Sequence, residues 1–144
     1  MATYSKLKKE YELGKTILLD RYTTSTLIYQ ASLIKDEKSK KEFLDYISDL
    51  EYEKIGIGKP DKVIFLCAPF ELVTSMRNER KQNEVVENDL HESNLEFMKK
   101  VYENVLFVAD YLSWDKVECN CGDKMRNIED IHKELYSLVK RKKF

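Results

Sequence analysis

The stretch TILLDRYTTSTLIYQ, residues 16–30, places a short apolar run directly before a pair of opposite charges and a cluster of hydroxyl side chains. Residues 16–19 have the length and composition of a buried strand, and residues 23–26 are polar residues of the kind that open a helix. Asp20 and Arg21 follow the predicted strand at its carboxyl end, where open α/β sheets bind their ligands. The stretch therefore predicts a strand–turn–helix unit with a binding site at its turn.

Arg21 is the candidate anion-binding residue of this unit. The first turn of the following helix carries partial positive charge, and a guanidinium group binds phosphate through two parallel hydrogen bonds. We expect the hydroxyls of residues 23–26 to cap the free N–H groups of that turn. The alternative is that Asp20 and Arg21 pair only with each other, as charged residues at strand ends often do.

Composition limits the classes of protein to which the chain can belong. Of its 144 residues 35% are charged, and the formal net charge is −1, so there is no overall positive field for nucleic acid. No apolar run approaches the roughly 20 residues that a membrane-spanning helix needs. We therefore expect a single domain, residues 1–144, that binds neither nucleic acid nor membranes.

The cysteines give no sign of a disulfide framework or a metal site. There are three, and an odd number favours reduced thiols, which are typical of a cytoplasmic protein. Cys119 and Cys121 form a C-x-C pair that lacks the two further ligands of a zinc site. No metal site is predicted from the residues.

Two more strands are predicted, over residues 62–67 and 114–119. Their alternation with helices predicts an α/β fold, a parallel sheet with flanking helices and right-handed crossovers. The G-x-G-K at residues 56–59 is predicted as a turn, because it lacks the spacing of a phosphate-binding loop and precedes a strand. Residues 81–89 are predicted to form a mobile surface loop. Helical periodicity predicts helices over residues 3–13, 23–34, 41–52, 71–80, 93–111 and 128–139.

Three segments resemble one enzyme family in the same order. DRYTTSTLIYQ, residues 20–30, resembles the DRYxxSxxAYQ signature of bacterial-type thymidylate kinases. KPDKVIFLCAPFELVTSMRNERK, residues 59–81, is similar to the family's PDxxxFLDVPPExxxxR segment. Residues 94–120 are similar to its long helix and last strand. The resemblance covers nearly the whole chain and implies a P-loop-kinase-like fold.

The resemblance also shows what the sequence lacks. Thymidylate kinases begin with a strand and a G-x-x-x-x-G-K-[ST] loop, which holds the phosphates of ATP. The four glycines of this chain form no such motif. The resemblance therefore implies the C-terminal two-thirds of the family fold, without its P-loop strand and helix. The missing strand would lie between residues 16–19 and 62–67 in the sheet, which we expect to be incomplete.

Roles for the signature residues are implied by the family. Arg21 would bind the 5′-phosphate of dTMP, and Asp20 would orient it or help to organise the Mg²⁺–phosphate centre. The other implied substrate-binding residues are Ser25 and Thr26 at the nucleotide, Tyr29 beside the deoxyribose, and Gln30.

A second set of basic residues resembles the start of the family's lid. Arg77, Arg80 and Lys81 would neutralise charge on the transferred phosphoryl group, which adds Arg77 and Arg80 to Arg21 as the implied catalytic residues. The alternative is an ordinary solvated helix end. Cys67 and Phe70 depart from the family, which commonly has Asp and Pro at these positions.

The function predicted for the intact enzyme is ATP-dependent phosphorylation of dTMP to dTDP, with Mg²⁺ and as a homodimer. This chain would retain the dTMP-phosphate and lid side and be inactive alone. The alternative is a non-catalytic remnant that dimerises, or binds a separate P-loop chain, through apolar residues such as Leu27 and Ile34. A deoxynucleoside kinase and an unrelated small α/β domain are the remaining alternatives. The signature disfavours the first, and the three matches in the same order disfavour the second.

Overall fold

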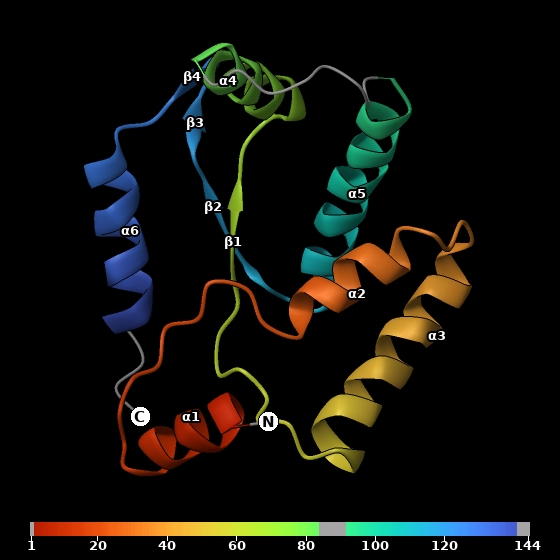
Figure 1. The fold of residues 1–144 in the computed structure, drawn as a ribbon, viewed down its shortest axis with the longest axis vertical. Helices are drawn as coiled ribbons and strands as arrows, with labels where there is room; N and C mark the ends of the chain where they lie inside the picture. The colour runs from red at the N-terminus through yellow and green to blue at the C-terminus, as the bar shows by residue number, and fades with distance from the viewer. Residues whose placement is uncertain (1, 84–91, 141–144) are drawn as a thin grey trace. The chain divides into compact units, whose positions relative to one another are not determined.

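A computed structural model of the chain describes residues 2–83 and 92–140 (Figure 1). The chain divides into two compact units, of which the first ends at Asp61 and the second begins at Lys62. Within the described residues, the first unit contains helices and connecting segments, whereas the strands lie in the second. The single domain expected from chain length stays a prediction.

The first unit is built on two helices that pack against each other, α2 (Thr24–Ala31) and α3 (Glu37–Ser48). Leu27 and Ala31 of α2 and Leu44 of α3 are almost fully buried. Because positions four apart lie on one face of a helix, Leu27 and Ala31 form a single apolar row. This row gives α2 one buried side and leaves its other sides to the candidate site residues.

Local chemistry explains where the helices of this unit begin and end. α1 (Ala2–Glu12) is followed by Gly14, whose φ of +79° is the left-handed conformation in which glycine commonly ends a helix. α3 begins earlier than its periodicity predicts, because the Asp36 side chain accepts a hydrogen bond from the Ser39 N–H over 2.7 Å. At its other end α3 continues directly into η1 (Asp49–Lys54), a π-helical turn.

The strand predicted over residues 16–19 is absent. Residues 15–19 have no regular secondary structure, and they belong to neither of the two sheets in the described chain. Leu18 is 85% exposed and Leu19 is 45% exposed. The prediction was wrong because an apolar run forms a strand only when a neighbouring strand offers hydrogen-bond partners and cover, and none of the described residues does so.

The second unit contains a small parallel sheet of β1 (Ile64–Cys67) and β2 (Asp115–Glu118). The register pairs Ile64 with Asp115 and Cys67 with Glu118. Both strands lie within the runs predicted from sequence, and their parallel direction is confirmed.

Two helices form the connection between these strands, α4 (Phe70–Asn83) and α5 (Glu92–Tyr111). α4 continues to Asn83, so the first residues of the loop predicted over 81–89 are helical. The rest of that predicted loop lies outside the described residues. The side chains of α5 that are buried belong to Val101, Asn104, Val105, Val108 and Ala109.

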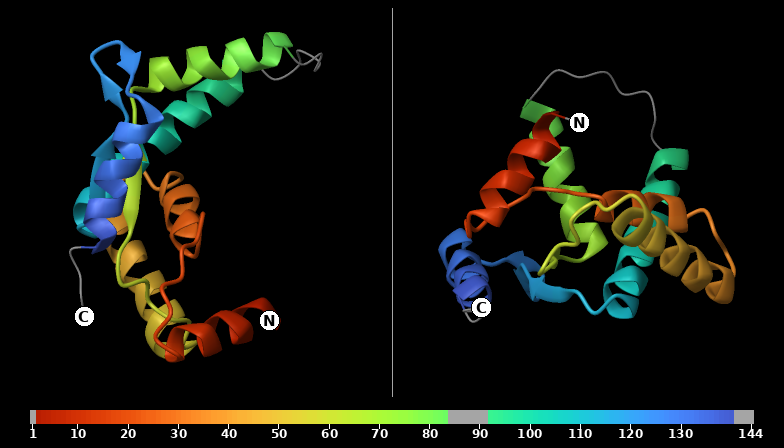
Figure 2. Two further views of the ribbon diagram at one scale, coloured as in Figure 1. Left: turned by 90° about the vertical axis from the view of Figure 1, so that its left-hand side faces the viewer. Right: turned by 90° about the horizontal axis from the view of Figure 1, so that it is seen from below.

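A short hairpin follows β2. β3 (Asn120–Cys121) and β4 (Lys124–Met125) pair antiparallel across a turn at Gly122, whose φ is +58° (Figures 1 and 2). Residues 122–123 form the turn between the two strands. The hairpin leads into α6 (Ile128–Lys140), which contacts β2.

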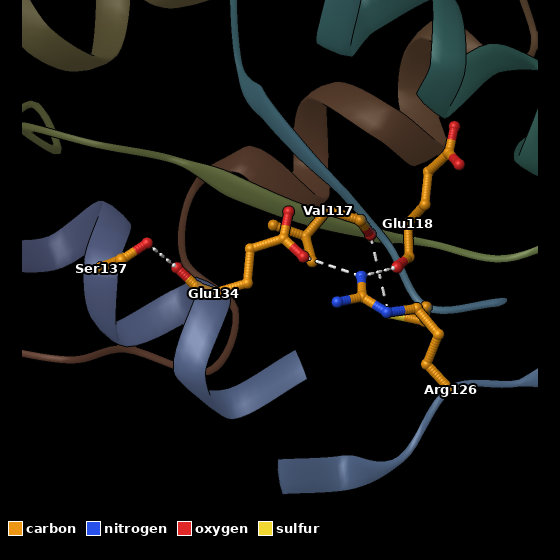
Figure 3. Close-up of polar contacts among 6 residues, drawn as sticks. Val117, Glu118, Arg126, Glu134 and Ser137 are labelled. Atoms are coloured by element: carbon orange, nitrogen blue, oxygen red, sulfur yellow. Dashed lines mark hydrogen bonds and ion pairs between the residues drawn. The ribbon is translucent and has the colours of Figure 1, made fainter. Parts of the chain in front are cut away.

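Polar bridges at both of its ends hold α6 in the second unit. Figure 3 shows Arg126 between the end of β2 and α6, with Nη1 donating to the Glu118 carbonyl over 2.5 Å and to Glu134 Oε2 over 2.7 Å. At the other end, Lys62 Nζ donates to the Leu138 carbonyl over 3.5 Å and forms an ion pair with Asp115 at 2.7 Å. The apolar residues Ile131, Leu135 and Leu138 of α6 are half-buried.

Candidate functional site

Arg21 adopts an unusual backbone conformation. Its φ is +67°, in the left-handed region that costs a residue with a Cβ atom about 1–2 kcal/mol. Such strain persists only where the surrounding structure holds it, and it gathers at functional sites. The Arg21 side chain is exposed, and so is that of Asp20.

The alternative that Asp20 and Arg21 pair with each other is not observed. Among the side chains that the structure describes, those of residues 6–79 and 94–140, neither Asp20 nor Arg21 has an ion-pair or hydrogen-bond partner. The first unit thus presents a cation and an anion side by side, and both are available to a ligand.

The two residues after Arg21 are anchored to the end of the first unit. The Tyr22 hydroxyl donates to the Gly58 carbonyl over 3.0 Å. The hydroxyls of Thr23 and Tyr52 lie 3.0 Å apart and share a hydrogen bond. The segment around Gly58 has no regular secondary structure, which agrees with the turn predicted there.

The predicted capping of α2 by hydroxyls is wrong. Thr23 is the N-cap residue, but its side chain makes no capping bond. The first turn instead uses main-chain acceptors, with Ser25 N–H donating to the Tyr22 carbonyl and Thr26 N–H to the Thr23 carbonyl, over 3.1 and 3.0 Å. This leaves the Thr23 hydroxyl for Tyr52.

The remaining signature residues lie on the sides of α2 away from its buried row. Ser25 and Tyr29 are four residues apart, as are Thr26 and Gln30, so each pair lies on one face. Ser25 is half-buried, and the other three are exposed. The structure therefore brings the signature residues 20–30 together on one unit.

Two residues that the sequence did not single out lie beneath this turn, on η1. Burial raises the pKa of Glu51, against the opposite effect of a hydrogen bond with Thr23. Oε2 of Glu51 is buried and has no hydrogen-bond partner among the described residues. Burial also raises the pKa of Tyr52. The periodicity gave no signal for this pair, because both residues fit an ordinary amphipathic helix.

The predicted lid residues are in the second unit. Arg77 is exposed on α4, and the side chains of Arg80 and Lys81 lie outside those that the structure describes. A role for these residues in phosphoryl transfer stays a prediction. A groove of about 410 Å³ lies between α4 and α5, with Phe70 and Leu95 among its lining residues.

At the carboxyl end of β1, Cys67 Sγ lies 3.9 Å from the Tyr102 hydroxyl. Burial, followed by hydrogen bonding and charge interactions with Cys67, raises the pKa of Tyr102 to about 12. Its ring packs against that of Phe70, with 5.9 Å between the ring centroids, so Tyr102 contributes to the packing of α5.

Comparison with known proteins decides the family. The sequence model of thymidylate kinases matches residues 1–135. The chain belongs to the thymidylate kinase family. It is 30% identical over 132 residues to the thymidylate kinase of Limosilactobacillus fermentum, covering 91% of this chain and 58% of that relative. It is also 30% identical over 135 residues to the probable thymidylate kinase of Thermococcus gammatolerans, covering 94% of this chain and 56% of the relative.

The resemblance of the three segments to thymidylate kinases is thus confirmed. The chain spans a little over half the length of these relatives. Its mixture of helices with a small parallel sheet is consistent with the P-loop-kinase-like fold of the family. No solved structure matches the chain significantly. In the part of the chain that the structure describes, no helix combines the length and apolarity needed to cross a bilayer.

Proposed function

We propose that this chain supplies the acceptor side of a thymidylate kinase, the part that holds dTMP while its phosphate receives a phosphoryl group. The observation that carries the proposal is Arg21, a strained and exposed arginine that forms no ion pair in the described residues. A guanidinium in that state is ready to bind a phosphate through two charge-assisted hydrogen bonds.

The signature residues and the two arginines of the predicted lid then have distinct roles. Arg21 binds the 5′-phosphate of dTMP, and Asp20 helps to organise the Mg²⁺–phosphate centre. Arg77 and Arg80 neutralise charge on the transferred phosphoryl group. The nucleotide contacts come from Ser25, Thr26, Tyr29 and Gln30.

Thymidylate kinases in general use ATP and Mg²⁺, and the residues present fit these two groups unequally. Mg²⁺ in nucleotide sites takes one or two protein carboxylates besides phosphate oxygens and water, so the exposed Asp20 suits it. The metal supplies charge neutralisation when it is bound. No glycine-rich motif is present for the ATP phosphates, and we assign no contact with them to this chain.

Binding measurements test the acceptor site. We expect isothermal titration with dTMP to give a dissociation constant that Arg21→Ala raises about tenfold to a hundredfold, because charge-assisted hydrogen bonds are lost. Lys35→Ala, which removes an exposed cation of the same unit, is the matched control and is expected to bind as the wild type does. Equal dTMP affinity of the wild type and Arg21→Ala contradicts the phosphate role.

Catalysis is a separate question. We propose that the chain alone is inactive, since it has no residues for the ATP phosphates, and that it works in the cytoplasm as part of a homodimer. A coupled assay of ADP release with dTMP, ATP and Mg²⁺ is expected to show no turnover by the purified chain. Turnover above that of a blank preparation contradicts this part of the proposal.

A second candidate is a binding module for a separate P-loop chain. It is favoured by β1, which pairs with β2 alone among the described strands, and by Leu66 in β1, which is 51% exposed. Leu27, expected in such a surface, is almost fully buried and cannot take part, whereas Ile34 is half-buried. Gel filtration of the chain, alone and mixed with a full-length relative, distinguishes a stable complex from a monomer.

A further inference from the structure

The two residues that follow Arg21 are both anchored by side-chain hydrogen bonds. Tyr22 and Thr23, immediately after Arg21, hydrogen-bond to Gly58 and Tyr52, at 3.0 Å each. Before Arg21, residues 15–19 have no regular secondary structure. The hydrogen bonds of these two residues fix the chain immediately after Arg21, where the backbone is left-handed.

η1 is the element that places Tyr52 beneath this turn. A π-helical turn widens the helix by one residue and so redirects the side chains that follow, and such turns are frequent at functional sites. Main-chain hydrogen bonds hold η1 in place, with Ile55 N–H donating to the Leu50 carbonyl and Ile57 N–H to the Glu51 carbonyl, both over 2.9 Å. The Tyr52 hydroxyl is thus mounted on a constrained backbone.

The Thr23 hydroxyl does not cap helix α2, although Thr23 is the N-cap residue. A threonine at an N-cap normally accepts a hydrogen bond from the first turn of its own helix, but this one makes none. It hydrogen-bonds instead to Tyr52, 29 residues away in the sequence, and to Glu51. Helix α2 therefore lacks the stabilisation that a side-chain cap would give. The Thr23 hydroxyl instead links α2 to η1, two residues after Arg21.

We propose that Tyr52 is a positioning residue for the phosphate site: its hydroxyl, mounted on η1, fixes Thr23 and thereby holds Arg21 in the conformation that receives the phosphate of a nucleoside monophosphate. This inference rests on the proposed phosphate role of Arg21. Tyr52 acts through Thr23 and touches no ligand itself.

The test compares a phosphorylated ligand with its unphosphorylated counterpart. In Tyr52→Phe, the dissociation constant for dTMP is expected to rise about fivefold to tenfold, as for the loss of one hydrogen bond, while that for thymidine is unchanged. In an Arg21→Ala background, Tyr52→Phe is expected to have no further effect, because the residue through which it acts is gone. Thr23→Val is expected to repeat the effect, and Thr23→Ser, which keeps the hydroxyl, to restore dTMP binding.

Tyr46→Phe is the matched control, since Tyr46 lies on the neighbouring α3 and is exposed. A loss that is equal for dTMP and thymidine, or one that adds to the Arg21→Ala loss, overturns the proposal and indicates general destabilisation.

A ligand-free measurement separates this inference from the proposed function. Backbone chemical shifts of Arg21 are expected to report a positive φ in the wild type and in Tyr46→Phe, and to move away from it in Tyr52→Phe. Unchanged Arg21 shifts in Tyr52→Phe overturn the positioning role, whatever binds. The Arg21 shifts can also move while Arg21→Ala binds dTMP as the wild type does. In that case Tyr52 controls the backbone conformation of Arg21, but Arg21 does not bind the phosphate, and the proposed positioning of a phosphate site is overturned.

Discussion

The hydroxyl of Tyr102, on α5, donates to the main-chain carbonyl of Ala68, just beyond β1, over 2.5 Å. Ala68 is buried, so its carbonyl has little access to water. The bond therefore ties α5 to the carboxyl end of β1, the end at which parallel sheets bind their ligands.

Removing this hydroxyl tests its contribution to stability. Tyr102→Phe keeps the ring packing with Phe70 but leaves the Ala68 carbonyl without its donor, which we expect to lower the free energy of unfolding by about 1–2 kcal/mol. Urea unfolding measures the change. Tyr136→Phe, at an exposed tyrosine of α6, is expected to unfold as the wild type does. A Tyr102→Phe midpoint equal to that of the wild type contradicts the contact.

The raised pKa of Tyr102 predicts a loss of stability at alkaline pH. The folded chain keeps this proton up to about pH 12, whereas the unfolded chain releases it near 10.0, the ordinary pKa of a tyrosine. Between these values the unfolded state binds fewer protons, so the free energy of unfolding falls as pH rises. We expect unfolding experiments across this window to show a smaller fall in Tyr102→Phe. Parallel curves for the two proteins rule out this tyrosine as the source.

The positive φ of Arg21 predicts that its glycine and alanine variants differ in stability but not in dTMP binding. Arg21→Gly relieves the left-handed strain and Arg21→Ala does not, so we expect the glycine variant to be about 1 kcal/mol more stable than the alanine variant. Both lack the guanidinium and should bind dTMP equally poorly. Thermal unfolding and titration test the two parts. Equal melting temperatures indicate that the chain does not hold this conformation in solution.

Arg126 is expected to secure α6 against local opening. Arg126→Met removes its bonds to the Glu118 carbonyl and to Glu134, whereas Glu134→Gln removes only the ion pair. Amide hydrogen exchange over residues 128–140 should therefore accelerate strongly in the first variant and weakly in the second. Lys133→Met, at an exposed cation on α6, is the control. Exchange that is equally slow in all four proteins contradicts this role.

Alanine substitutions at two leucines of the first unit are expected to have very different effects on the free energy of unfolding. Leu44→Ala opens a cavity at a fully buried position and should cost about 2–5 kcal/mol, whereas Leu18→Ala should change stability by less than about 0.5 kcal/mol. Chemical unfolding compares them directly. A large loss from Leu18→Ala indicates that residues 16–19 are covered in solution, as the sequence suggested.

The contrast between residues 62–67 and 16–19 shows what sequence patterns can predict about the fold. Both runs are apolar and short, and both read as buried strands. β1 forms because β2 lies parallel to it, with Cys119 N–H donating to the Cys67 carbonyl over 2.7 Å. Residues 16–19 find no such neighbour among the described residues. Local composition carries the tendency to form a strand, but the identity of its partner is a long-range property.

The residues of the candidate site also divide into those that the sequence could predict and those that only the fold brings together. Asp20, Arg21 and the α2 residues belong to one contiguous motif, so the sequence placed them together. Tyr52 could not be found by that route, because it meets Thr23 only through the three-dimensional fold and through a π-helical turn that leaves no mark in the periodicity. The strain at Arg21 was also hidden, since no residue type there announces a positive φ.

Among the described strands, β1 pairs with β2 alone, which has a practical consequence for work with the chain. The amide and carbonyl groups that alternate residues of β1 direct away from β2, next to the partly exposed Leu66, are a template on which a second molecule can align. We expect concentrated preparations to associate edge to edge. A partner that pairs with this edge of β1 is therefore expected to improve the solubility of the chain as well as the order of the strand.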